Sequence, residues 1–310
     1  MNIFAQLELP LDLIVFICFA VGACLVVWAV IFKRWLSRTP ILQYEPRRRV
    51  PWQIWDLLAV VFFYIAVFAL LIQLAQYFYF PESNELSRKL SDGQITTAHP
   101  LVQLLAVKNW TAFFLCGMAA VVVAPIAEEF LFRILLQGWL EKVDRDWRRR
   151  FHVLRRWMPL AAMPIIIASL IFAWPHFREA APQVDVNYLV LALACDSIAK
   201  ILTFIFGIAF LHWRVGATAA DLGWAPGKIL ADVRLGLIAF IAVRVPIYAG
   251  QIILVKLVPK EYAPDPIPIF FFAIALGLIY NRTHRAAPSI VAHMALNASS
   301  LAMFLLWGEG

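Results

Sequence analysis

The chain has 310 residues, 63% of them hydrophobic and 15% charged, and its formal net charge at pH 7 is +7. Soluble domains are about half apolar and about a quarter charged, so this composition excludes an ordinary soluble protein and favours one polytopic membrane domain. The positive charge requires no nucleic acid, because basic residues beside a membrane contact anionic lipid head groups.

Apolar runs recur along the whole chain. We predict an all-α membrane bundle of about eight transmembrane helices, since each crossing needs about 20 apolar residues. The expected spans are residues 12–32, 57–80, 104–127, 159–177, 188–211, 235–258, 267–281 and 288–307.

The basic residues predict an orientation. With the N-terminus outside, most of the 27 Lys and Arg residues fall in loops on the cytoplasmic side, as basic residues do in membrane proteins. The densest cluster is 142–156, which we expect to be a cytoplasmic loop that contacts anionic lipid. The sequence therefore predicts an integral multipass protein of the plasma or inner membrane with both termini outside.

Two adjacent carboxylates, Glu128 and Glu129, lie at the end of the third apolar run and are followed by Arg133. Residues four apart share a helix face, so Glu129 is expected to pair with Arg133. Glu128 is rotated by about 100° and would be left uncompensated, which suits a group that takes and returns a proton. The alternative is a buried pair that only fixes helix packing.

Two further polar pairs lie in apolar segments. Phe172 and His176 are four residues apart, and so are His293 and Asn297. The second pair can donate two hydrogen bonds to one point, as an oxyanion hole requires, although His and Asn also join helices by packing. Because His293 lies close to the end of its helix, we expect the connection at 282–288 to dip into the protein.

The three motifs together, EExxxR, FxxxH and HxxxN, resemble the CPBP or Abi family of intramembrane proteases, which includes the type II CAAX prenyl endopeptidases and bacteriocin self-immunity proteins. The resemblance covers about residues 104–307. It divides the chain into an N-terminal two-helix membrane segment, 1–100, and a protease-like core, 101–310.

The resemblance also implies roles. Glu128 would activate a water, His176 would orient it, and His293 with Asn297 would stabilise the oxyanion. Glu129, Arg133 and Phe172 would support these catalytic residues. The substrate would be a membrane-associated peptide or protein.

Metal dependence stays open at this point. We favour a metal-free site, but Glu128, His176 and His293 could also bind zinc with one position left for water. The sequence contains no HExxH, GxGD or GxSG motif, and none of the four cysteines has metal-ligand spacing.

Two other functions compete with proteolysis. A non-catalytic immunity or scaffold protein could have the same fold. A transporter could use the intramembrane charges Asp196, Lys200 and Arg244, although Asp196 and Lys200 are four apart and would neutralise each other.

Overall fold

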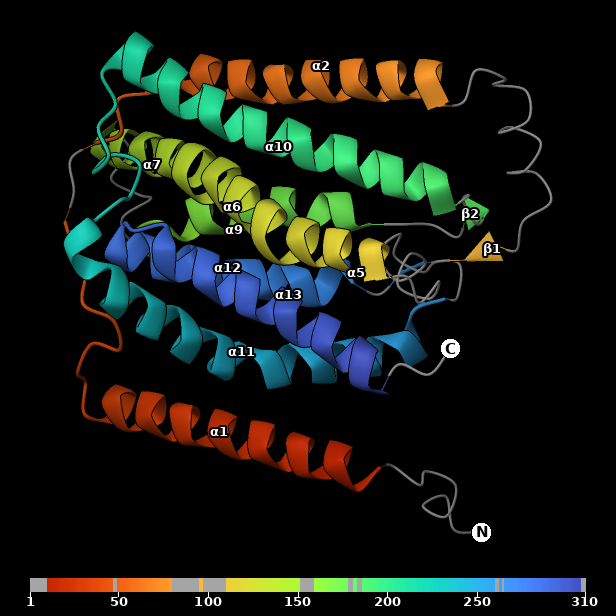
Figure 1. The fold of residues 1–310 in the computed structure, drawn as a ribbon. Helices are drawn as coiled ribbons and strands as arrows, with labels where there is room; N and C mark the ends of the chain where they lie inside the picture. The colour runs from red at the N-terminus through yellow and green to blue at the C-terminus, as the bar shows by residue number, and fades with distance from the viewer. Residues whose placement is uncertain are drawn as a thin grey trace.

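A bundle of long apolar helices makes up the computed structural model, which describes residues 10–46, 49–79, 95–96, 110–150, 159–177, 181–182, 186–259, 262–263 and 265–307 (Figure 1). Seven helices in this part of the chain are long and apolar enough to cross a membrane, and a shorter apolar helix occupies Ala162–His176. The predicted all-α bundle is confirmed, with one of its eight expected spans shortened.

The helices follow the expected order. Their bounds are α1 (Leu11–Leu36), α2 (Ile54–Tyr79), α5 (Trp110–Gly117), α6 (Ala124–Glu129), α7 (Gly138–Arg150), α9 (Ala162–Ala173), α10 (Val186–Val215), α11 (Ile229–Leu257), α12 (Pro266–Thr283) and α13 (Ala287–Trp307). Two-residue strands, β1 (Ile95–Thr96) and β2 (Ala181–Pro182), pair antiparallel with Ile95 opposite Pro182.

The third span differs most from its prediction. Helices α5, α6 and α7 form one run, joined by π-helical segments at Met118–Val123 and Phe130–Gln137. The expected loop at 142–156 is therefore wrong as far as Arg150, because α7 continues through it. Its charges support the helix, since Arg148 Nε lies 2.8 Å from Asp144 Oδ2 one turn earlier. Residues 151–156 lie outside the described part.

The start of α1 and the end of α13 lie together at one end of the molecule. Trp307 Nε1, at the end of α13, donates to Asp12 Oδ2 in the first turn of α1 at 3.1 Å. The opposite end carries basic residues from several elements (Figure 1). They include Lys33 and Arg34 of α1, Arg148, Arg149 and Arg150 of α7, Arg214 of α10, Lys228 before α11, and Arg282 of α12.

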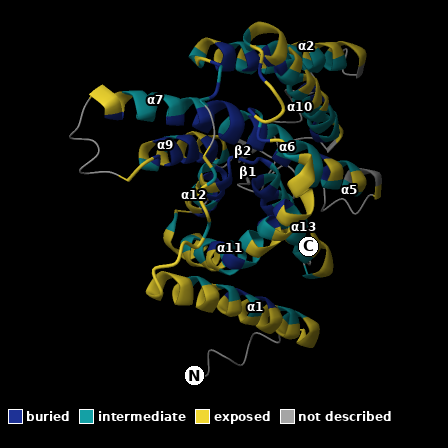
Figure 2. Ribbon diagram, turned by 90° about the vertical axis from the view of Figure 1, so that its left-hand side faces the viewer, coloured by how far each residue is buried: buried dark blue, intermediate teal, exposed yellow. Residues whose placement is uncertain are grey.

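The centre of the bundle contains α6, α12 and α13, with α9 packed against α12, whereas α1 lies at the edge against α11 (Figure 2). Glycines permit close approach at two helix crossings. A Cβ on Gly207 of α10 would lie 2.7 Å from the Phe130 ring, and one on Gly236 of α11 would lie 2.7 Å from the Pro288 carbonyl. Small residues at helix interfaces allow such contacts, so α10 packs closely against the end of α6, which carries Glu128 and Glu129, and α11 packs closely against the start of α13.

The connection between α12 and α13 is buried, as predicted for this segment. Thr283, His284 and Arg285 are each less than 9% exposed. Arg285 Nε donates to Asp232 Oδ1 at 2.6 Å, and its Nη1 donates to Glu45 from the connection between α1 and α2. The α1–α2 connection thus lies against the α12–α13 connection.

We predict that an outside-only thiol reagent will label Lys256→Cys but not Arg149→Cys on intact cells. Both positions are exposed and lie in the last turns of α7 and α11, and these two helix ends are at opposite ends of the bundle in Figure 1. The basic end should face the cytoplasm. The unsubstituted protein, with its own four cysteines, provides the background. Labelling of Arg149→Cys alone would reverse the orientation.

A second prediction concerns pH. The hydrogen bond from Arg285 lowers the pKa of Glu45 below its ordinary value of 4.5. Because the pKa is lower in the folded state, the ion pair stabilises the fold at pH values above the ordinary pKa. This stabilisation is lost as the pH falls through the lowered pKa. As the pH is lowered below 4.5, the thermal midpoint of Glu45→Gln should therefore decrease less steeply than that of the unsubstituted protein. Parallel curves would contradict this.

Candidate functional site

The two glutamates lie between the two π-helical segments. In the first segment, the N–H of Ala124 bonds the carbonyl of Ala119, five residues earlier. The next donor in this register would be Pro125, which has no N–H. The carbonyl of Ala120 instead accepts a hydrogen bond from Asn297 Nδ2 at 2.7 Å. Asn297 of α13 thus replaces the missing backbone donor, and this bond holds its side chain beside α6.

Glu129 is the most enclosed carboxylate of the site, with none of its surface exposed. Its Oε1 lies 3.1 Å from His293 Nδ1, and its Oε2 accepts from Arg133 Nε at 3.3 Å. The predicted pairing of Glu129 with Arg133 is present. The Arg133 guanidinium also lies 5.2 Å from the centre of the Phe172 ring, a cation–π contact.

Glu128 is partly exposed, with 22% of its side chain accessible. Its Oε2 lies 3.9 Å from His293 Nε2, and its Oε1 lies 3.7 Å from the Lys200 ammonium of α10. The expectation that Glu128 is uncompensated is therefore wrong. A cation from a helix distant in sequence supplies the opposite charge that the helix itself does not provide.

His293 connects the two glutamates through its two ring nitrogens. When Nδ1 carries the hydrogen and donates to Glu129, Nε2 carries the lone pair and faces Glu128. A water placed at hydrogen-bonding distance from both Nε2 and Oε2 would subtend an angle of roughly 90° at its oxygen. The pair can therefore hold one water between a carboxylate and an imidazole.

His176 lies at the end of α9, in a single 3₁₀ turn at Trp174–His176 that contains Pro175. Its Nδ1 is 3.1 Å from the Phe172 carbonyl. The Phe172 ring lies 5.6 Å from the His176 ring and 5.7 Å from the His293 ring, centre to centre. Phe172 thus contacts both imidazoles.

The structure places Glu128 and His293 side by side. His176 is near them because Phe172 contacts both imidazoles, and Asn297 is near them because it binds the Ala120 carbonyl. Convergence of all four side chains on one cavity stays a prediction. The packing and orienting roles of Glu129, Arg133 and Phe172 agree with their contacts but also stay predictions.

Lys200 is the neighbour of Glu128 that sequence reasoning missed. The predicted pairing of Lys200 with Asp196 is present, at 2.9 Å between Nζ and Oδ2. Asp196 Oδ1 also accepts from the Tyr64 hydroxyl of α2 at 2.5 Å. The four-residue spacing of Asp196 and Lys200 marked them as a pair, but no local pattern connected them to Glu128 or to Tyr64.

Arg244, the third intramembrane charge, lies away from this site. Its guanidinium packs 4.8 Å from the centre of the Phe16 ring and 5.3 Å from that of Phe240. Cation–π contacts of this kind stabilise a charge in an apolar setting. This placement gives Arg244 no contact with the glutamates.

Among the residues that the structure describes, no three His, Cys, Asp or Glu side chains are grouped so that they could hold a metal ion. The alternative zinc ligands Glu128, His176 and His293 are thus not arranged as a ligand set. Whether the reaction depends on a metal stays a prediction, which adding a chelator to an activity assay would test.

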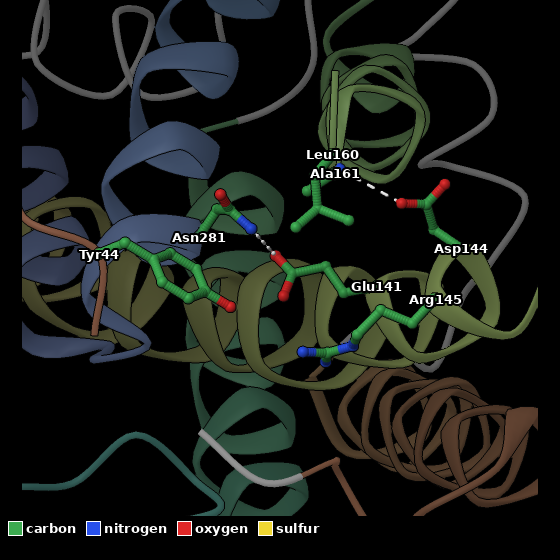
Figure 3. A pocket seen from close by; sticks show the side chains of 7 residues that line it. All are labelled: Tyr44, Glu141, Asp144, Arg145, Leu160, Ala161 and Asn281. Carbon is green, nitrogen blue, oxygen red and sulfur yellow. Dashed lines mark hydrogen bonds between the residues drawn. The ribbon is translucent and has the colours of Figure 1, made fainter. Parts of the chain in front are cut away.

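A small cavity of about 10 Å³ is lined by residues of α7, α12 and the connections beside them, and neither Glu128 nor Glu129 lines it (Figure 3). This volume is about that of one water. Glu141 points into the cavity and accepts hydrogen bonds from Gln137 and Asn281 at 3.1 and 3.0 Å. The cavity is too small to enclose a peptide. Its lining residues are Tyr44, Glu141, Asp144, Arg145, Leu160, Ala161 and Asn281.

Together, these features define a multispan membrane protein with a carboxylate–imidazole site between its helices. The chain matches the family described as type II CAAX prenyl endopeptidase Rce1-like over residues 109–299, more than half of its length. It therefore belongs to the Rce1-like family, in agreement with the resemblance of its motifs. No curated protein and no solved structure matches the chain.

We predict that Arg133→Ala will lower the folded yield and the thermal midpoint of the protein in detergent. The change leaves Glu129 buried without its guanidinium, and breaking a buried pair typically costs about 3–5 kcal/mol. Arg149→Ala, at an exposed position, is the matched control and should behave like the unsubstituted protein. Normal stability of Arg133→Ala together with lost turnover would instead assign Arg133 a direct role in catalysis.

Proposed function

We propose that the protein is an intramembrane endopeptidase in which Glu128 and His293 activate a water for attack on a peptide bond. The observation that carries the proposal is the 3.9 Å separation of Glu128 Oε2 and His293 Nε2. The hydrogen bond from His293 to Glu129 supports it, because it fixes the orientation of the imidazole. Membership of an endopeptidase family supports the same reaction.

In the proposed reaction, the water oxygen bonds to the peptide carbonyl carbon while its proton passes to Glu128. The carbonyl oxygen becomes negative and needs hydrogen-bond donors. His176 is proposed to contact the water, and Asn297 is proposed to donate to the oxyanion. His293 also donates to the oxyanion when it is protonated. Collapse of the intermediate breaks the carbon–nitrogen bond, and Glu128 returns the proton to the leaving amine.

The proposed substrate is a peptide held at the membrane. Since the matched family is described as prenyl endopeptidases, a peptide with a prenylated cysteine near its C-terminus is the first substrate to test. The same peptide without the prenyl group should be the comparison. The basic end of the bundle, proposed to face the cytoplasm and anionic lipid head groups, would be where such a peptide approaches.

Glu128→Gln should abolish hydrolysis by the purified protein, because the amide keeps the shape but cannot accept the proton. Asn297→Ala should lower kcat by about 10² to 10³, the effect of losing one oxyanion donor. The thermal midpoint of each variant separates lost chemistry from lost folding. Full turnover by Glu128→Gln would refute the proposed mechanism, and full biological activity without hydrolysis would favour a scaffold or immunity role.

A chelator should leave hydrolysis unchanged in the same assay if the site works without a metal. Loss of activity with chelator, and its return with zinc, would instead make Glu128, His176 and His293 the candidate ligands. The role of activating the water would then pass to a metal ion.

A further inference from the structure

A chain of polar side chains extends from the candidate site to a helix outside the matched family region. Lys200 Nζ lies 3.7 Å from Glu128 Oε1 and 2.9 Å from Asp196 Oδ2. Asp196 Oδ1 accepts from the hydroxyl of Tyr64 at 2.5 Å. Tyr64 is on α2, before the matched residues 109–299. Three helices, α2, α10 and α6, thus contribute to one chain of contacts that ends on Glu128.

We propose that Lys200, held in place by Asp196 and Tyr64, is a positioning residue that keeps the Glu128 carboxylate beside His293. The proposal rests on the proposed function, in which Glu128 accepts the proton of the attacking water. It assigns a role in the reaction to α10 and to the N-terminal helix α2.

The charges favour this role over simple neutralisation within α10. Charged groups inside a membrane are costly and normally pair, and Asp196 alone would compensate Lys200. Yet the ammonium is placed between two carboxylates. A lysine has a flexible stem and a point charge with three donors, so a second anchor is needed to keep it at Glu128. Asp196 provides that anchor, and the Tyr64 hydroxyl restrains Asp196.

The packing of α10 also favours the role. Gly207 brings α10 close enough for its backbone to meet the Phe130 ring, next to the glutamates. On the other side, Phe63 of α2 stacks on Phe206 of α10 with ring centres 3.9 Å apart. These contacts fix α10 between α2 and α6 (Figure 1), and the Lys200 side chain reaches Glu128 from this position.

The test separates positioning from charge balance. Lys200→Met alone leaves two carboxylates without their cation and should lower stability, which would obscure an effect on kcat. The double variant Asp196→Asn, Lys200→Met removes the pair together and keeps the charge of α10 balanced. We expect this double variant to fold with nearly unchanged KM and with kcat lowered by about 10 to 10²-fold, the range that misplacement of a catalytic group produces. Lys200→Arg should retain most of kcat.

Tyr64→Phe has a matched control in Tyr77→Phe on the same helix, since Tyr77 is 75% exposed. Tyr64→Phe should lower kcat less than the double variant does, and Tyr77→Phe should leave kcat unchanged. A double variant with full kcat, or equal effects at Tyr64 and Tyr77, would overturn the positioning role.

A second measurement does not depend on activity. The thermal midpoint is measured for Lys200→Met, Glu128→Gln and their combination, as in a double-mutant cycle. The effect of Lys200→Met should be smaller when Glu128 is already Gln, because the contact is then absent. Equal shifts in both backgrounds would overturn the contact. An active Glu128→Gln would refute the proposed function, whereas an inactive Glu128→Gln beside a fully active double variant would refute only this inference.

Discussion

The buried carboxylate of Glu129 is the constraint on which the centre of this bundle depends. It has no exposed surface, and it is held by Arg133 on its own helix and by His293 on α13. An uncompensated charge at this depth would be very costly, so both partners must be in place when the helices pack. The same bond orients His293, which leaves its second ring nitrogen facing Glu128. Packing and the proposed chemistry thus share one interaction.

A related constraint acts on the backbone, because a carbonyl inside a membrane must find a donor within the protein. Two prolines create such a need. Pro125 leaves the carbonyl of Ala120 to the amide of Asn297. Within α11, Pro246 leaves the carbonyl of Ala242, which accepts from Trp28 Nε1 of α1 at 2.9 Å. Pro125 therefore helps to place Asn297, and Pro246 frees the carbonyl to which α1 attaches.

The N-terminal part of the chain forms hydrogen bonds with the region that matches the family at two places along the bundle. At the basic end, Trp52 is fully buried and its Nε1 donates to the Leu135 carbonyl in the second π-helical segment at 3.1 Å. Deeper in the bundle, Tyr64 binds Asp196. The division at residue 100 stays a prediction, but these contacts make the first two helices part of the environment of the glutamates.

The sequence by itself determined the membrane class, most of the helices and the ion pairs between residues four apart. Hydropathy and four-residue spacing are local properties, so Glu129 with Arg133 and Asp196 with Lys200 were predictable. It also indicated the family, because each of the three motifs is short and contiguous in the sequence. Only the tertiary structure decided that Lys200 reaches Glu128, that Asn297 serves the Ala120 carbonyl, and that α7 replaces the expected loop. The first two contacts depend on which helices pack together and at what rotation, and the helical continuation depends on charges satisfied by neighbours.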